Sequence, residues 1–127
     1  LRGCSGVIVV DASALLAFLQ GEPGADRVEE ILDDSVIGAA NWSEVAQKVR
    51  ASGADWGIAS GLLLSYRLKV EPVSQRDAEA AAESWRRESE LSLGDRLCLA
   101  LARRLDLPVL TADRAWGESE RIEQLRR

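Results

Sequence analysis

The chain has 127 residues, of which 46% are hydrophobic and 29% charged, and its formal net charge is −5. This composition is ordinary for one globular domain, and no apolar run approaches the roughly 20 residues of a membrane-spanning helix. Histidine is absent, which excludes Ser-His-Asp triads, paired-histidine ribonuclease chemistry and histidine-ligated zinc.

Strand-like and helix-like segments alternate from the start of the chain. Residues 1–6, LRGCSG, are taken as a leader or a cloning remnant, and residues 7–127 as a single domain. Residues 7–10, VIVV, are an apolar β-branched run typical of a strand buried on both faces. Next we expect a helix over residues 12–20, a turn at 21–24, a helix over 25–32 and a short strand at 36–37.

The second half repeats this alternation. Trp42, Val45, Ala46 and Val49 show the spacing of an amphipathic helix, and residues 56–66 repeat it. A third strand at 70–73 is placed at the sheet edge because Pro72 cannot donate a ladder hydrogen bond. Helices at 75–90 and 93–105, a strand at 108–111 and a weak edge strand at 122–125 complete the chain. The order predicts a three-layer α/β/α sandwich around a four- or five-stranded parallel sheet.

Four acidic residues stand at the beginnings of helices or the ends of strands. Asp11 and Asp113 each follow a strand directly, whereas Glu44 and Asp95 lie in the first turns of helices. Each also has a purely structural explanation. Asp is a common N-cap, and the sequences N-W-S-E and S-L-G-D, which end at Glu44 and Asp95, both have the spacing of a capping box. Taken one at a time, these acids are better explained as helix caps.

Considered together, the same acids favour a metal site. The carboxyl ends of parallel strands meet at one edge of a sheet, where ligands bind. Several carboxylates gathered there repel one another and raise one another's pKa until a cation arrives. An all-oxygen ligand set suits Mg²⁺ or Mn²⁺. Such cations would also answer the objection that a chain of net charge −5 lacks the basic footprint of nucleic-acid binding.

Three blocks of sequence resemble the VapC branch of the PIN-domain family, the toxins of bacterial and archaeal toxin–antitoxin pairs. They are VVDASALLAFLQGEPGA, the NWSEV helix start and LSLGDRLCLALARRLDLPVLTADRAW, and the resemblance covers residues 7 to about 117. It makes residues 7–127 a PIN-like domain. The family's four acids map onto Asp11, Glu44, Asp95 and Asp113 as catalytic metal ligands, with Ser13 and Thr111 in supporting positions.

The resemblance implies a Mg²⁺- or Mn²⁺-dependent endoribonuclease that leaves a 5′-phosphate and a 3′-hydroxyl. It also implies a homodimer that a small antitoxin neutralises. Because Cys4 and Cys98 form neither a disulfide framework nor a zinc set, a reducing cytoplasm is the expected location. Two alternatives stay open: a phosphatase or phosphotransferase with Asp11 as nucleophile, although Ser13 stands where such enzymes want an acid, and a non-catalytic module with this fold.

Other side chains are compatible with two roles. Trp42 and Trp85 occupy apolar helical positions and are expected in the core, whereas Trp116 is the best candidate for an exposed position from which it could stack on a base. Arg96 and Arg114 each follow a candidate metal ligand. Either could contact a phosphate or be an ordinary surface arginine.

Overall fold

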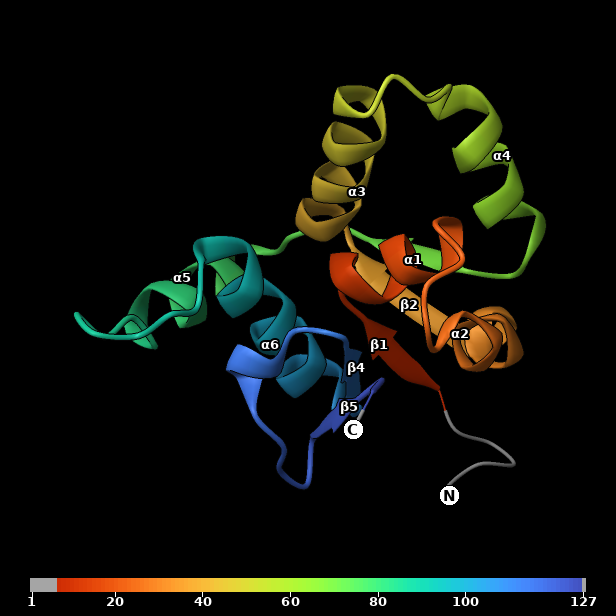
Figure 1. Cartoon of the computed structure of the whole chain (residues 1–127). Helices are drawn as coiled ribbons and strands as arrows, with labels where there is room; N and C mark the ends of the chain where they lie inside the picture. Colours follow the sequence, from red (N-terminus) through yellow and green to blue (C-terminus); the bar gives the residue numbers. More distant parts are fainter. Residues whose placement is uncertain (1–6, 127) are drawn as a thin grey trace.

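The computed structural model describes residues 7–126, so the leader assigned to residues 1–6 lies outside the described residues. The strands are β1 (Ile8–Val10), β2 (Ser35–Gly38), β3 (Lys69–Glu71), β4 (Val109–Thr111) and β5 (Ile122–Gln124). All neighbouring pairs are parallel, in the order β3-β2-β1-β4-β5 (Figure 1). The five-stranded parallel sheet is therefore confirmed, including the weak last strand and the edge position of β3.

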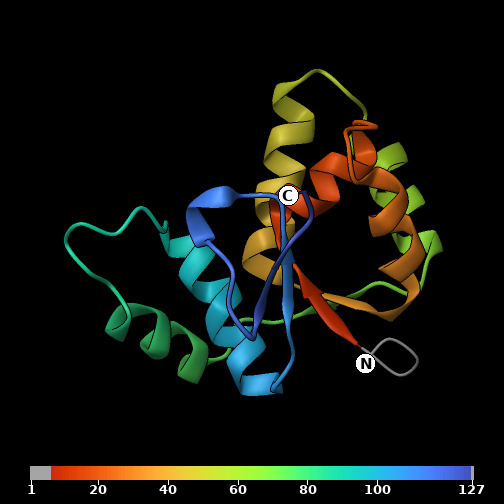
Figure 2. The same ribbon diagram turned by 60° about the horizontal axis from the view of Figure 1, so that its bottom comes forward.

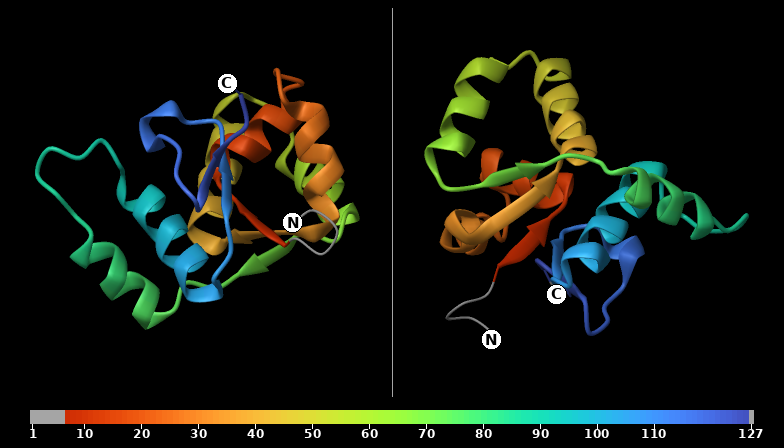
Figure 3. Two further views of the ribbon diagram at one scale, coloured as in Figure 1. Left: turned by 90° about the horizontal axis from the view of Figure 1, so that it is seen from below. Right: turned by 180° about the vertical axis from the view of Figure 1, so that it is seen from behind.

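Helices cover both faces of the sheet, which confirms the three-layer sandwich. On one side lie α1 (Ala12–Leu19), α2 (Ala25–Ile31), α3 (Ala39–Ala51) and α4 (Trp56–Ser65), and on the other lie α5 (Gln75–Glu83) and α6 (Leu93–Leu105) (Figures 1 and 3). Short 3₁₀ turns, η1 (Leu32–Asp34) and η2 (Arg114–Trp116), precede β2 and follow β4. Within residues 7–126 no helix has the length and apolarity to cross a bilayer.

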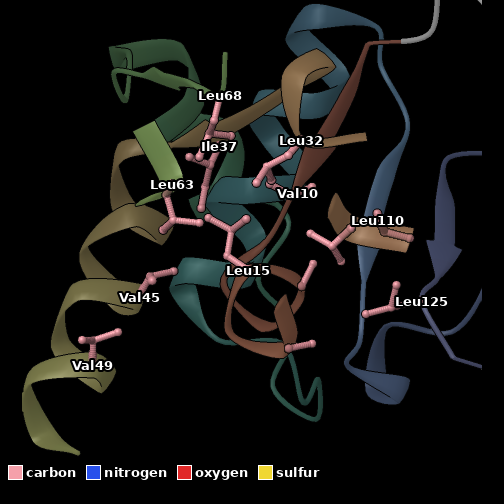
Figure 4. Packing of buried hydrophobic residues seen from close by; sticks show 13 residues of the cluster. Val10, Leu15, Leu32, Ile37, Val45, Val49, Leu63, Leu68, Leu110 and Leu125 are labelled. Atoms are coloured by element: carbon pink, nitrogen blue, oxygen red, sulfur yellow. The ribbon is translucent and has the colours of Figure 1, made fainter. Parts of the chain in front are cut away.

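Successive residues of each central strand point into different cores. Val10, Ile37 and Leu110 pack with side chains of α1–α4 such as Leu15, Val45 and Leu63 (Figure 4). Their neighbours Val9, Val36 and Val109 pack on the opposite face against α6. Because both faces are apolar, the central strands read as continuous hydrophobic runs rather than as alternating ones.

Three expectations about local structure were wrong. The helix expected at 75–90 ends at Glu83, and residues 84–92 form a loop that projects from the body (Figure 3). Trp85, in that loop, is 51% exposed, because α5 ends two residues before it. Trp116, the candidate for an exposed role, is buried, since η2 folds it back against the α6 side of the sheet. Finally, α3 begins after Gly38, so Asn41 lies inside the helix and is not its cap.

Candidate active site

Asp11 is the most deeply buried of the four predicted acids, with 4% of its surface exposed. It follows β1 and caps α1, and its Oδ1 accepts the backbone N–H of Ala14 at 3.0 Å. The Ser13 hydroxyl donates to the same oxygen at 2.8 Å, and the Thr111 hydroxyl donates to Oδ2 at 2.5 Å. The carboxylate thus has three hydrogen-bond donors, and all of them are neutral.

The pKa of Asp11 reflects its burial without a neighbouring positive charge. Desolvation raises its pKa to about 6, and the nearby charge of Asp95 adds to the rise. The hydrogen bonds from Thr111, Ala14 and Ser13 act in the opposite direction but do not cancel the effect of burial. A positive charge beside Asp11 would restore its ordinary acidity.

Thr111 connects the ends of β1 and β4. Besides donating to Asp11, its Oγ1 accepts the backbone N–H of Asp113 at 3.0 Å. The Ser13 hydroxyl likewise accepts the backbone N–H of Ala112 at 2.8 Å. Asp113 caps η2 through its Oδ1, which accepts the N–H of Ala115 at 2.9 Å. The two predicted supporting residues therefore join the segment that carries Asp11 to the one that carries Asp113.

Glu44 reaches the same edge from α3. Its Oε1 accepts from the Asn41 side-chain amide at 2.8 Å, and that amide also donates to the backbone oxygen of Gly94 at 3.1 Å. A Cβ atom on Gly94 would lie 2.6 Å from Glu44 Oε2, so only glycine lets the carboxylate come this close to α6. Asn41, 1% exposed, joins α3 to the start of α6 next to Asp95.

Asp95 is both a helix cap and a member of the acidic group. Its Oδ2 accepts the N–H of Ser92 at 2.9 Å, while its own N–H donates to the Ser92 hydroxyl at 3.1 Å, so the predicted capping box is present. One turn later on α6, the thiol of Cys98 is fully buried, and burial raises its pKa. The charges of Asp11, Asp95 and Glu44 raise it further. Carboxylates from three different elements are therefore near enough to Cys98 to influence its pKa.

The four acids supply suitable donors for a hard dication but do not enclose one. Among residues 7–126, no three acidic or cysteine side chains are close enough to form a ready metal cluster. Glu44, Asp95 and Asp113 each have one oxygen engaged in a hydrogen bond that the described chain provides. The other oxygen of each remains available, and an all-oxygen set of this kind suits Mg²⁺ or Mn²⁺. The donor chemistry fits, whereas the spacing would have to tighten around the ion.

Two residues near the acids were missed by sequence reasoning. Asn41 was assigned to a helix cap, although its spacing of three residues from Glu44 allows a hydrogen bond between the two side chains inside a helix. Gly94 stands in the first turn of α6, where a glycine costs helix stability and can indicate close approach of another group. Arg96 does not face the acids, because its Nη1 donates to the backbone oxygen of Ala81 on α5 at 2.6 Å.

Comparison with known proteins agrees with this architecture. The PIN domain family model matches residues 8–121. Ribonuclease VapC42 of Mycobacterium tuberculosis and VapC ribonuclease Mb2780c of Mycobacterium bovis are each 30% identical over 115 residues, which cover 81% of this chain and 88% of the relative.

Two solved structures show the likeness in fold. A toxin–antitoxin complex from Klebsiella pneumoniae matches with a TM-score of 0.76 at 20% identity, over 94% of this chain and 98% of the other. VapC20 of Mycobacterium tuberculosis, described as a toxin that cleaves the sarcin–ricin loop, matches with a TM-score of 0.68 at 20% identity, over 89% and 97%. From the family model, which spans residues 8–121, and the relatives that cover 81% of its length, this chain belongs to the PIN domain family.

Proposed function

We propose that this chain is a metal-dependent endoribonuclease and the toxin of a toxin–antitoxin pair. The observation that carries the proposal is the buried Asp11 carboxylate, which has only neutral hydrogen-bond donors and a raised pKa and lies within the electrostatic influence of Asp95. The relatives named VapC ribonuclease support RNA as the substrate.

In the proposed site, Asp11, Glu44, Asp95 and Asp113 hold Mg²⁺ or Mn²⁺. When bound, the dication supplies positive charge for the oxygens of the scissile phosphodiester. Thr111 and Ser13 orient the Asp11 carboxylate through the hydrogen bonds at 2.5 and 2.8 Å. Asn41 holds Glu44 against Gly94, which fixes the position of one Glu44 oxygen.

The alternative with Asp11 as a covalent nucleophile is less consistent with the geometry. Such an enzyme would place an acid two residues after its nucleophile, whereas this chain has Ser13 there, and the Ser13 hydroxyl donates to Asp11 Oδ1 at 2.8 Å. A non-catalytic module would have no need of an uncompensated buried carboxylate, which costs free energy of folding.

The direct test is cleavage of single-stranded RNA in Mg²⁺ or Mn²⁺, with EDTA as the metal-free control. We expect Asp95→Asn to abolish cleavage but to fold, because Asn can accept the Ser92 N–H as Asp95 does. Asp55→Asn is the matched control, since Asp55 is an exposed cap of α4 whose Oδ1 accepts the N–H of Ile58. Equal cleavage by the parent and Asp95→Asn would reduce these acids to helix caps.

An apolar groove offers a docking place for the proposed antitoxin. It lies between α1, α3 and α4, has a volume of about 310 Å³, and is lined by side chains that include Leu16, Leu19, Val49, Ile58, Ala59 and Leu62. Ile58 is 74% exposed and Leu62 46%, which is unusual for large apolar side chains that have no partner to cover them. Neighbours in fold were solved as toxin–antitoxin assemblies, among them DNA-bound VapBC from Salmonella typhimurium.

Expression in a host cell tests the toxin proposal separately. Strong expression of the chain without an antitoxin should arrest growth, and Asp95→Asn at equal protein level should relieve the arrest. Normal growth with abundant soluble parent protein would contradict the toxin assignment. The homodimer and the cytoplasmic location stay predictions.

A further inference from the structure

A hollow of about 350 Å³ lies beside Asp113, on the β5 side of the acidic group. Its lining consists of Arg114, Gly117, Glu118, Gln124 and Arg126. Arg114 directly follows Asp113, and Gln124 is the last residue of β5. The hollow therefore adjoins the proposed active site but is built from other residues.

The order of the strands puts this hollow in line with the acids. β1, β4 and β5 lie side by side and parallel, so Asp11, Thr111 and Gln124 mark successive positions at one edge of the sheet (Figure 2). Adjacent strands lie about 4.8 Å apart, so the end of β5 is roughly 10 Å from the end of β1. A nucleic-acid strand that crosses this edge at Asp11 would pass the hollow with a neighbouring nucleotide.

The floor of the hollow is firmly built. Gln124 is 6% exposed, and its Nε2 donates to the backbone oxygens of Asp113 and Gly117, both at 2.9 Å. Gly117 has φ 68° and ψ −162°, a combination essentially restricted to glycine. Gln124 thus fixes the turn after Asp113 and links the shape of the hollow to the position of that acid.

Two guanidinium groups supply the positive charge that the acidic edge lacks. Arg114 is exposed and directly follows Asp113 in the chain. Arg126 is held at the rim, where its Nη1 donates to the backbone oxygen of Pro23 at 3.2 Å and to Glu22 Oε1 at 3.4 Å. Glu118 is the acidic member of the lining. In a chain of net charge −5, a phosphate would find its cationic partners here.

We propose that this hollow binds a backbone phosphate of the RNA next to the scissile nucleotide, through Arg114 and Arg126. The proposal rests on the ribonuclease function proposed above and assigns these arginines to substrate positioning. Guanidinium groups suit phosphate oxygens because they can donate two parallel hydrogen bonds. A contact to phosphate positions the strand without reading its sequence.

The test compares Arg114→Gln and Arg126→Gln with the parent and with the control Arg103→Gln. Arg103 is an exposed arginine in the last turn of α6, at the opposite end of that helix from Asp95. Cleavage of a single-stranded RNA is followed over a series of NaCl concentrations. We expect each hollow variant to lower kcat/KM about tenfold, chiefly through KM, and to flatten the plot of log(kcat/KM) against log[NaCl] by about 0.7. The control should keep the parent's slope.

Binding of the same RNA, and of a DNA of equal length, is measured by fluorescence anisotropy in Ca²⁺. Both ligands should lose affinity to a similar extent in the hollow variants, since a guanidinium reads phosphate and not sugar. A loss confined to RNA, or salt slopes equal to that of Arg103→Gln, would overturn the proposal. If the parent cleaves RNA and the hollow variants cleave it equally well, the phosphate subsite is rejected but the ribonuclease function is not. If the parent does not cleave RNA, the ribonuclease function is rejected. The affinities measured by anisotropy then test the phosphate subsite without reference to cleavage.

Discussion

Two aspartates of this molecule expose similarly small fractions of their surface but differ in their partners. Asp11 is 4% exposed and Asp77 is 3% exposed. Both Asp77 oxygens accept from the guanidinium of Arg104, at 2.8 and 3.0 Å, and this contact lowers the pKa of Asp77. Asp11 has only hydroxyl and amide donors, and its pKa is about 6. Neutral donors satisfy the hydrogen-bonding capacity of a carboxylate but do not balance its negative charge. The charge of Asp77 is therefore balanced within the fold, whereas the charge of Asp11 is not.

The largest expected effect is a difference in RNA cleavage between variants of the two aspartates. Asp11→Asn should lower RNA cleavage about a thousandfold, or about 4 kcal/mol of transition-state stabilisation, because an amide is a poor ligand for a dication. Asp77→Asn should keep the parent's cleavage rate per folded molecule. Single-turnover cleavage at saturating Mg²⁺ measures both. Comparable losses in the two variants would show that the missing counter-charge does not give Asp11 a role in cleavage that Asp77 lacks.

The pH dependence of stability should also differ. The folded-state pKa of Asp11 is about 6, above the 3.8 that is usual for an aspartate side chain in water. Between these values the folded state binds more protons than the unfolded state. The contribution of Asp11 to stability is therefore fully present below about pH 4 and is lost as pH rises through 6, by up to about 3 kcal/mol.

Urea unfolding in EDTA at several pH values from 4 to 7 measures this loss. The free energy of unfolding of the parent minus that of Asp11→Asn should fall as the pH rises across that range. Taking the difference cancels the pH dependence that the other carboxylates contribute to both proteins. Added Mg²⁺ should restore the parent at pH 7 by binding the folded state. A difference that does not change with pH would contradict the uncompensated burial of Asp11.

Asp77→Asn should destabilise the protein by roughly 2 kcal/mol at pH 7. Removing a partner of a fully buried ion pair costs about 3–5 kcal/mol, and the partial exposure of Arg104 reduces that cost. Because the pKa of Asp77 is lowered, its contribution is present above about pH 4 and is lost as the pH falls further. Arg104→Gln and the double variant complete a mutant cycle, in which strictly additive losses would argue against coupling.

A smaller effect is expected at Asn41. Asn41→Ala removes the donor to Glu44 and to the Gly94 oxygen, and should lower cleavage about tenfold, or ~1.4 kcal/mol. If Asn41 positions Glu44, the Mg²⁺ concentration for half-maximal cleavage should rise as well. Ser43→Ala, an exposed change on the same helix, is the control. Lower stability with an unchanged Mg²⁺ requirement would make Asn41 a purely structural residue.

Local pattern was sufficient for most of the fold. VIVV at residues 7–10 predicted β1 because both of its faces are apolar, and the Ser92–Asp95 spacing predicted the capping box of α6. The end of α5, the exposure of Trp85 and the turn that buries Trp116 were not predicted. They depend on where residues 84–92 and 113–117 turn, which helical periodicity does not encode.

Some features of the candidate site could likewise be predicted from the sequence, and others could not. Asp11 and Asp113 could be placed because each follows a strand whose carboxyl end lies at a known edge. The approach of α6 to α3 could not be predicted, since it depends on the contact of Asn41 with Gly94, 53 residues away. No repeat or motif within α3 or α6 indicates that contact.

The hydrogen bond between Thr111 and Asp11 also has a consequence for the timing of synthesis. It joins residues 100 positions apart, and β5 closes the sheet only after them. A ribosome that makes this chain must release the whole segment from Asp11 to Thr111 before the two side chains can meet. A nascent chain that ends before Thr111 therefore lacks the assembled carboxylate edge, and the site can form only after the ribosome has released both of these residues.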